Sequence, residues 1–154
     1  FLTGERAPFV APQATASFLG MTTKTSKADM ARAVMEGASF SLRHCLESTQ
    51  ITPSDKITLT GGGARNKLWC QIMADVLGVT IVANAAEDHG LWGAALIGGA
   101  AAGLMNPDQP ARSEDSFSYA PNPTAHATYD RLFENYVQMI ALSRGIWDIQ
   151  RNTL

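Results

Sequence analysis

The sequence predicts an α/β fold in which parallel strands are covered by helices. Residues 56–60 and 79–83 have the β-branched alternation of short strands, and each is followed by an apolar segment of helical character. The connections between these segments are short, and a strand–helix–strand–helix order implies parallel strands with helical crossovers. Two strands cannot close a doubly wound sheet, so we expect the missing strands from upstream sequence or from a partner.

The composition is that of a globular domain, and it excludes disorder as a description of the whole chain. The chain has 154 residues, of which 45% are apolar and 17% are charged. That charged share lies below the usual ~25%, which suggests a surface that another domain or subunit covers, including a second copy in a homodimer. With a net charge of −2 and no basic run, nucleic acid is not an expected partner. Cys45 and Cys70 lack metal-ligand spacing and are expected to be packed thiols in a reducing, cytoplasmic compartment.

The first half of the chain is expected to be a loop followed by a helix. Residues 1–25 are read as loop and short extended structure, because prolines and a glycine interrupt any helix. A helix is predicted over residues 26–48, since Ser26 and Asp29 have the spacing of a capping box. The side chains expected to be buried along it are Met30, Ala33, Val34, Gly37 and Phe40.

Residues 26–105 are expected to form the core. The strand at 56–60 runs into three glycines, and a helix follows that ends at Gly78. The apolar segment 90–105 is predicted to be a buried helix: its 16 residues would span only ~24 Å, short of the ~30 Å of a bilayer core, so no membrane span is expected. Residues 106–123 are expected to be a loop, and 124–150 a last helix. Its apolar stripe comprises Tyr129, Leu132, Phe133, Tyr136 and Ile140.

The triple glycine is the segment most informative about function. Gly61, Gly62 and Gly63 join a strand to a helix, where a backbone without Cβ atoms can approach a ligand and the first N–H groups of the helix attract an anion. A glycine turn that only allows packing remains an alternative. A P-loop is excluded because its motif does not occur, and a dinucleotide fingerprint is a near miss because Asn66 stands where a third small residue is needed.

Two ordered stretches resemble the FGGY carbohydrate kinases, which have the actin/hexokinase-like (ribonuclease H-like) fold. The first is ASFLGM at 16–21 followed after seven residues by DMARAVME at 29–36, and it matches the second signature of that family. The second is TLTGGGARN at 58–66 with GAA at 93–95, which is similar to the adenosine motif. GERAPF at 4–9 is like a loop of xylulose, erythritol and related kinases. The likeness covers nearly the whole chain up to residue 103.

The resemblance implies that Gly61, Gly62 and Gly63 lie against the phosphates and ribose of ATP or ADP, and that Asn66 borders the adenine. Arg65 is expected to point to solvent. In this family Mg-ATP donates its γ-phosphoryl group to a sugar or polyol hydroxyl, and an aspartate takes the proton. No catalytic residue and no metal ligand is assigned in this chain.

Other acidic residues are expected to be structural. Asp29 and Glu36 are interpreted as capping and packing residues, and Glu87, Asp88 and His89 as capping and turn residues. Glu5 and Arg6 are interpreted as a local ion pair or a contact of a loop that faces a cleft.

We therefore expect residues 1–154 to be the C-terminal part of the nucleotide-binding domain of a sugar kinase, acting on a pentulose or an erythritol-like polyol. The chain begins with Phe1 inside a loop, so we expect it to be a piece of a longer polypeptide that is inactive without its N-terminal lobe. A Rossmann-like dinucleotide-binding domain of an oxidoreductase and a non-catalytic actin-like interaction module are the alternatives.

Overall fold

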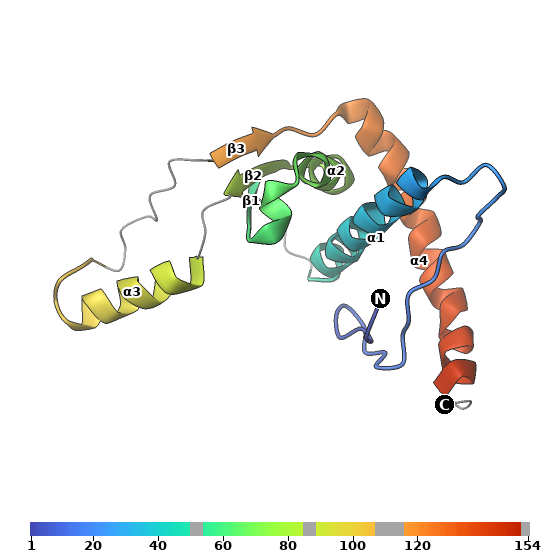
Figure 1. Cartoon of the computed structure of the whole chain (residues 1–154), viewed down its shortest axis with the longest axis horizontal. Helices are drawn as coiled ribbons and strands as arrows, with labels where there is room; N and C mark the ends of the chain where they lie inside the picture. The colour runs from blue at the N-terminus through green and yellow to red at the C-terminus, as the bar shows by residue number, and fades with distance from the viewer. Residues whose placement is uncertain (50–53, 85–88, 107–115, 152–154) are drawn as a thin grey trace.

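A computed structural model describes residues 1–49, 54–84, 89–106 and 116–151 (Figure 1). Its elements in chain order are α1 (Lys27–Ser48), β1 (Lys56–Thr60), the 3-10 turn η1 (Gly62–Arg65), α2 (Lys67–Leu77), β2 (Thr80–Asn84), α3 (His89–Ala101), β3 (Ser116–Tyr119) and α4 (Pro123–Arg151). The segment before α1 contains no helix, as predicted, and it folds back on itself through a bridge between Glu5 and Ala11.

The sheet has the strand order β1-β2-β3. β1 and β2 are parallel, with Lys56 opposite Thr80 and Thr60 opposite Asn84, which confirms the predicted crossover. β3 pairs antiparallel to β2, so the prediction of a loop throughout 106–123 is wrong at β3. Four residues followed closely by two prolines are a weak strand signal, and pairing with β2 decides this segment. The α/β class is confirmed, with a mixed rather than purely parallel sheet.

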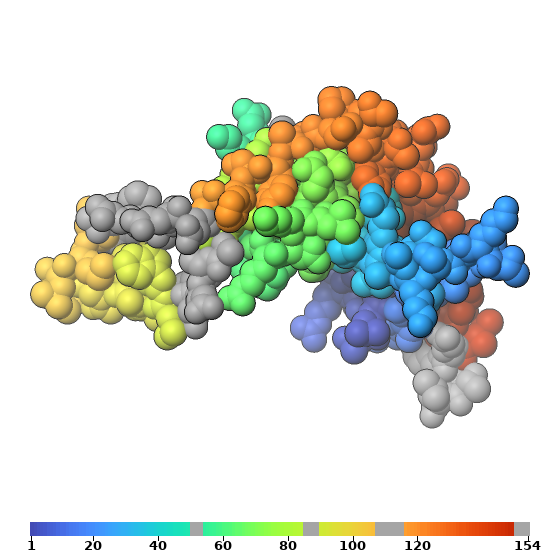
Figure 2. All heavy atoms as spheres, turned by 45° about the horizontal axis from the view of Figure 1, so that its top comes forward, coloured from blue at the N-terminus to red at the C-terminus, as the bar shows by residue number. Residues whose placement is uncertain are grey.

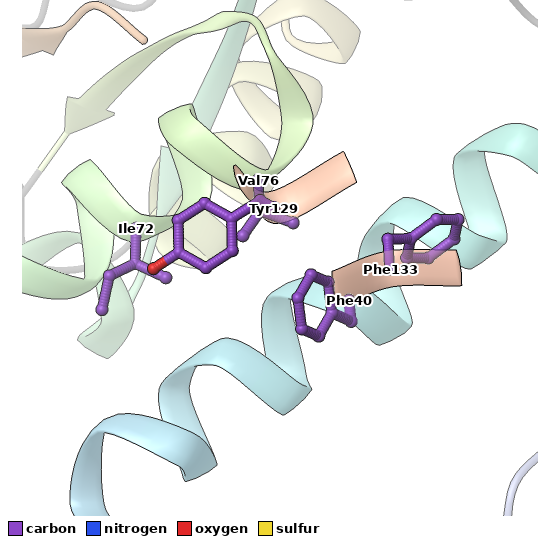
Figure 3. Packing of buried hydrophobic residues seen from close by; sticks show 5 residues of the cluster. All are labelled: Phe40, Ile72, Val76, Tyr129 and Phe133. Atoms are coloured by element: carbon purple, nitrogen blue, oxygen red, sulfur yellow. The ribbon is translucent and has the colours of Figure 1, made fainter. Parts of the chain in front are cut away.

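α2 lies between the sheet and the two long helices. On one side its Met73 and Ala74 pack with Ile81 of β2. On the other side Ile72 and Val76 join an aromatic cluster contributed by α1 and α4, shown in Figure 3. The members of that cluster are Phe40, Ile72, Val76, Tyr129 and Phe133. Since α2 is covered on both sides, Ile72, Met73 and Val76 are all buried, whereas Leu68 in its first turn is 51% exposed.

The beginning of α1 forms as predicted, but its buried face differs from the expectation. Ser26 Oγ accepts a hydrogen bond from Asp29 N at 3.2 Å, and Asp29 Oδ2 accepts one from Ser26 N at 2.9 Å, which completes the capping box. Phe40 is buried, whereas the prediction is wrong for Ala33 and Val34, which are exposed; Val34 is 60% exposed. Met30 and Gly37 are half-buried. The apolar residues of α1 occupy two adjoining faces of the helix, and only the face toward α2 and α4 is covered.

The prediction that the apolar segment after β2 is buried is wrong for the described chain. α3 lies beside the body of the molecule (Figures 1 and 2), and Leu91 and Ile97 are 67% and 73% exposed. Its apolar residues occur on every side, so the sequence does not select one face for packing. Within the described residues, no helix has both the length and the apolar character needed to cross a membrane.

The last helix and the two thiols largely follow the expectation. α4 buries Tyr129, Phe133 and Ile140, but Leu132 is 41% exposed at the margin of the stripe. Cys70 is buried, Cys45 is half-buried, and both are free thiols.

Candidate functional site

The glycine turn lies at the carboxyl end of β1, next to the same end of β2. Gly61 has φ 80° and ψ −162°, a conformation that is essentially restricted to glycine. The chain then makes the 3-10 turn η1 before α2 begins. The expectation that the glycines lead directly into the helix is therefore wrong, because η1 lies between them. Hydrogen bonds from Ala64 N to Gly61 O and from Asn66 N to Gly63 O, both 3.1 Å, close the turn.

The three glycines have different reasons to be glycine. Gly61 needs its positive φ. Gly63 lies over an indole, because a Cβ built on it would be 3.4 Å from Cζ3 of Trp69. Gly62 has neither constraint: its φ is not in the left-handed range, and a Cβ there would meet nothing within 4 Å. Gly61 and Gly62 are exposed, so the turn presents bare backbone to its surroundings.

Asn66 begins α2 rather than lining a cavity of the described chain. Its Oδ1 accepts a hydrogen bond from Trp69 N at 3.1 Å, which makes it the N-cap of α2. Its Nδ2 donates to Met35 Sδ of α1 at 3.8 Å. The side chain is exposed, as is that of Arg65. The structure thus brings Gly61, Gly62, Gly63 and Asn66 together at one exposed turn, while their contact with a nucleotide stays a prediction.

Three side chains that support the turn were not recognised as such from the sequence. Cys70 Sγ donates to the carbonyls of Gly63 at 3.7 Å and Ala64 at 3.6 Å, and burial raises the pKa of this thiol, so it keeps its proton. Trp69 Nε1 donates to Ser39 Oγ of α1 at 3.2 Å. The only signal in the sequence is that Trp69 and Cys70 follow Asn66 by one turn of helix, and Ser39 gives none.

The acidic residues of α1 are structural, as predicted. Glu36 Oε1 accepts hydrogen bonds from Tyr129 Oη at 2.8 Å and from Arg32 Nε at 2.7 Å. Burial and the hydrogen bond to Glu36 raise the pKa of Tyr129, which therefore acts as a neutral donor. Hydrogen bonds from the backbone and hydroxyl of Ser26 lower the pKa of Asp29. Both carboxylates are thus engaged in contacts that hold α1 and α4 in place or begin α1.

The remaining polar candidates have mixed outcomes. Glu5 does not pair with the side chain of Arg6; its Oε1 accepts from the backbone N of Arg6 at 2.8 Å. Glu87, Asp88 and the side chain of His89 lie outside the described residues. Within the described part of the chain, no three His, Cys, Asp or Glu side chains are grouped as metal ligands would be.

Two surface hollows run along α4, and neither is lined by a residue of the glycine turn. In the first, Arg43 Nη1 lies 2.8 Å from Asp130 Oδ1 and Arg43 Nε lies 2.8 Å from Glu47 Oε1. In the second, the Arg144 guanidinium lies 4.8 Å from the centre of the Phe9 ring. Arg43 is thus already paired with two carboxylates and Arg144 with an aromatic ring, and the glycine turn remains the candidate site.

Comparison with known proteins agrees with the resemblance in the sequence. Residues 1–102 match the C-terminal domain of the FGGY family of carbohydrate kinases. The xylulose kinase of Escherichia coli K12 is 31% identical over 92% of this chain and 32% of its own length. The gluconate kinase structure from Lactobacillus acidophilus has a TM-score of 0.81 and 32% identity, covering 96% of this chain and 31% of that one.

A ligand-bound xylulose kinase structure from Lactobacillus acidophilus is also similar, with a TM-score of 0.79 and 33% identity over 92% of this chain and 30% of that one. The chain therefore spans about a third or less of the length of these relatives. The match to the family model covers the glycine turn and the helix α1 that supports it. This chain belongs to the FGGY family of carbohydrate kinases, and it carries the C-terminal domain of that family.

Proposed function

We propose that this chain is the nucleotide-binding C-terminal part of an ATP-dependent kinase that phosphorylates a sugar or a polyol. The observation that carries the proposal is Gly62: neither its backbone conformation nor its neighbours require glycine, and a Cβ there would extend into open space. A glycine without an internal reason at an exposed strand-to-helix turn is explained by a ligand that approaches the backbone closely.

The turn fits an anionic ligand better than a cation. Residues 61–66 contain no carboxylate, and the backbone of Gly61 and Gly62 is exposed. We assign Gly61, Gly62 and Gly63 to the phosphates and ribose, and Asn66 to the border of the adenine. Mg-ATP supplies the phosphoryl group when it is bound, and we expect its Mg²⁺ to be held by the nucleotide and by residues outside this chain.

The chemistry requires more than this chain. Phosphoryl transfer depends on positioning two substrates and stabilising charge, and the acidic residues of α1 are already engaged in capping and ion pairing. We therefore place the catalytic aspartate and the sugar contacts in an N-terminal lobe of a longer polypeptide, and expect the 154-residue chain alone to be inactive. The family assignment favours this proposal over a dinucleotide-binding oxidoreductase or a non-catalytic module.

Calorimetric titration of the complete polypeptide with ADP, ATP and NAD tests the site. We expect binding of ADP and ATP and no binding of NAD. A coupled assay of ADP release with xylulose, erythritol and gluconate then tests the reaction and its acceptor. Binding of NAD without ADP would overturn the nucleotide assignment, and sugar-dependent turnover by the 154-residue chain alone would overturn its predicted inactivity.

A further inference from the structure

The indole of Trp69 packs against the backbone of the glycine turn. A Cβ on Gly63 would lie 3.4 Å from Cζ3 and 3.6 Å from Cε3 of Trp69, so the backbone of Gly63 rests on the six-membered part of the ring. Gly63 therefore cannot move toward α2 unless the indole moves as well.

A hydroxyl group of α1 fixes the orientation of that indole. Ser39 is fully buried, and its Oγ donates to the carbonyl of Met35 at 2.8 Å. Since a hydroxyl has one proton and two lone pairs, Ser39 can also accept the hydrogen bond from Trp69 Nε1 at 3.2 Å. The bond holds the indole against rotation about its side-chain torsions.

The same part of α1 also contacts the other end of the turn. Asn66 Nδ2 donates to Met35 Sδ at 3.8 Å. Met35 and Ser39, one helical turn apart on α1, therefore contact Asn66 and Trp69 respectively. The helix α1 thereby holds both the indole that packs against Gly63 and the residue assigned to the adenine border, Asn66.

We propose that Trp69 is a positioning residue for the nucleotide, and that Ser39 acts through it by holding the indole under Gly63. The inference rests on the proposed function. Its physical basis is preorganisation: a turn that is already held in its binding conformation loses less conformational freedom when the nucleotide binds. Neither side chain is expected to touch the nucleotide.

The test compares Ser39→Ala with a matched control, Ser143→Ala, in the complete polypeptide. Ser143 is also buried, and its Oγ donates to the carbonyl four residues earlier, Met139, at 2.8 Å. The two substitutions remove the same intrahelical bond, but only Ser39→Ala also removes the acceptor of the indole N–H. We expect ADP to bind about 3- to 10-fold more weakly to Ser39→Ala, the fold-change that one hydrogen bond accounts for. Ser143→Ala should bind ADP like the unsubstituted protein.

Two further measurements separate positioning from general stability. The indole N–H resonance of Trp69, assigned as the one that disappears in Trp69→Phe, should move in Ser39→Ala and stay in place in Ser143→Ala. Trp69→Phe, which keeps an aromatic ring and removes the donor, should weaken ADP binding to a similar degree as Ser39→Ala.

The outcomes distinguish this inference from the proposed function. If the unsubstituted protein binds ADP and both Ser39→Ala and Trp69→Phe bind it equally well, the positioning role is overturned and the proposed function stands. Lower thermal midpoints with unchanged ADP affinity would overturn the positioning role in the same way. If the unsubstituted protein does not bind ADP, the proposed function fails, and this inference fails with it.

Discussion

Gly62→Ala separates the folding role of the glycine turn from its proposed binding role. The added Cβ would meet no atom of the chain within 4 Å, and the φ of Gly62 is one that alanine can adopt. Substitution of glycine by alanine at a compatible position stabilises a protein by about 0.4–1 kcal/mol, because the unfolded chain loses freedom. We therefore expect the free energy of unfolding in urea to stay equal or to rise slightly.

Nucleotide binding should respond in the opposite direction. The methyl group would occupy the space in which we place the phosphates, and it would displace them from the backbone N–H groups. Loss of one hydrogen bond to a charged group costs about 1.5–3 kcal/mol, which corresponds to about 10- to 150-fold weaker binding of ADP by calorimetry. Binding of ADP at unchanged affinity would refute the contact, and with it the observation on which the proposed function depends.

Gly61→Ala is the matched substitution one residue earlier. Its Cβ would also meet open space, but φ 80° with ψ −162° strains any residue with a side chain. Strain of this kind costs about 1–3 kcal/mol, so we expect a clear loss of stability where Gly62→Ala shows none. Equal stabilities of the two variants would contradict the described conformation of the turn.

Four other substitutions test the fold. Phe40→Ala should lower the free energy of unfolding in urea by about 3–5 kcal/mol, because it empties the middle of the aromatic cluster, whereas Val34→Ala, at a site that is 60% exposed, should change it by less than about 0.5 kcal/mol. Gly78→Ala should cost about 1–3 kcal/mol in the same assay, because φ is 68° and the new Cβ would lie 2.6 Å from Cε1 of His126; an unchanged midpoint would contradict this contact. Burial raises the pKa of Tyr136 to about 12 from an ordinary value of 10.0. As the pH rises, the unfolded state therefore loses this proton first, and the free energy of unfolding should fall by about 2 kcal/mol between pH 10 and 12. Tyr136→Phe should remove that part of the fall. A pH profile of Tyr136→Phe identical to that of the unsubstituted protein would argue against the burial of Tyr136.

Local signals in the sequence predicted the elements whose formation depends on nearby residues. Ser26 and Asp29 form the capping box from their own side chains and backbone, and Gly78 ends α2 because it can adopt a positive φ. The glycine turn after β1 was recognisable for the same reason. Helix and strand ends of this kind involve only a few consecutive residues, so their chemistry can be recognised without the rest of the fold.

Packing partners were predicted less well. The exposed Val34 and the apolar α3 lie on faces that the described chain does not cover, and periodicity alone cannot say whether a face has a partner. β3 was missed because four residues become a strand only beside β2. For the candidate site, Gly61, Gly62, Gly63 and Asn66 were named from the motif, but the roles of Trp69 and Ser39 depend on contacts between α1 and α2.

By itself, the sequence determined the α/β class, the kinase family and the position of the glycine turn, because these depend on the order of residues over short stretches of chain. Only the tertiary structure decided which apolar faces are buried, that the sheet is mixed, and that a serine 24 residues before Gly63 holds the indole beneath it. Contacts of this kind join segments that are distant in the chain, and their existence depends on where the helices pack.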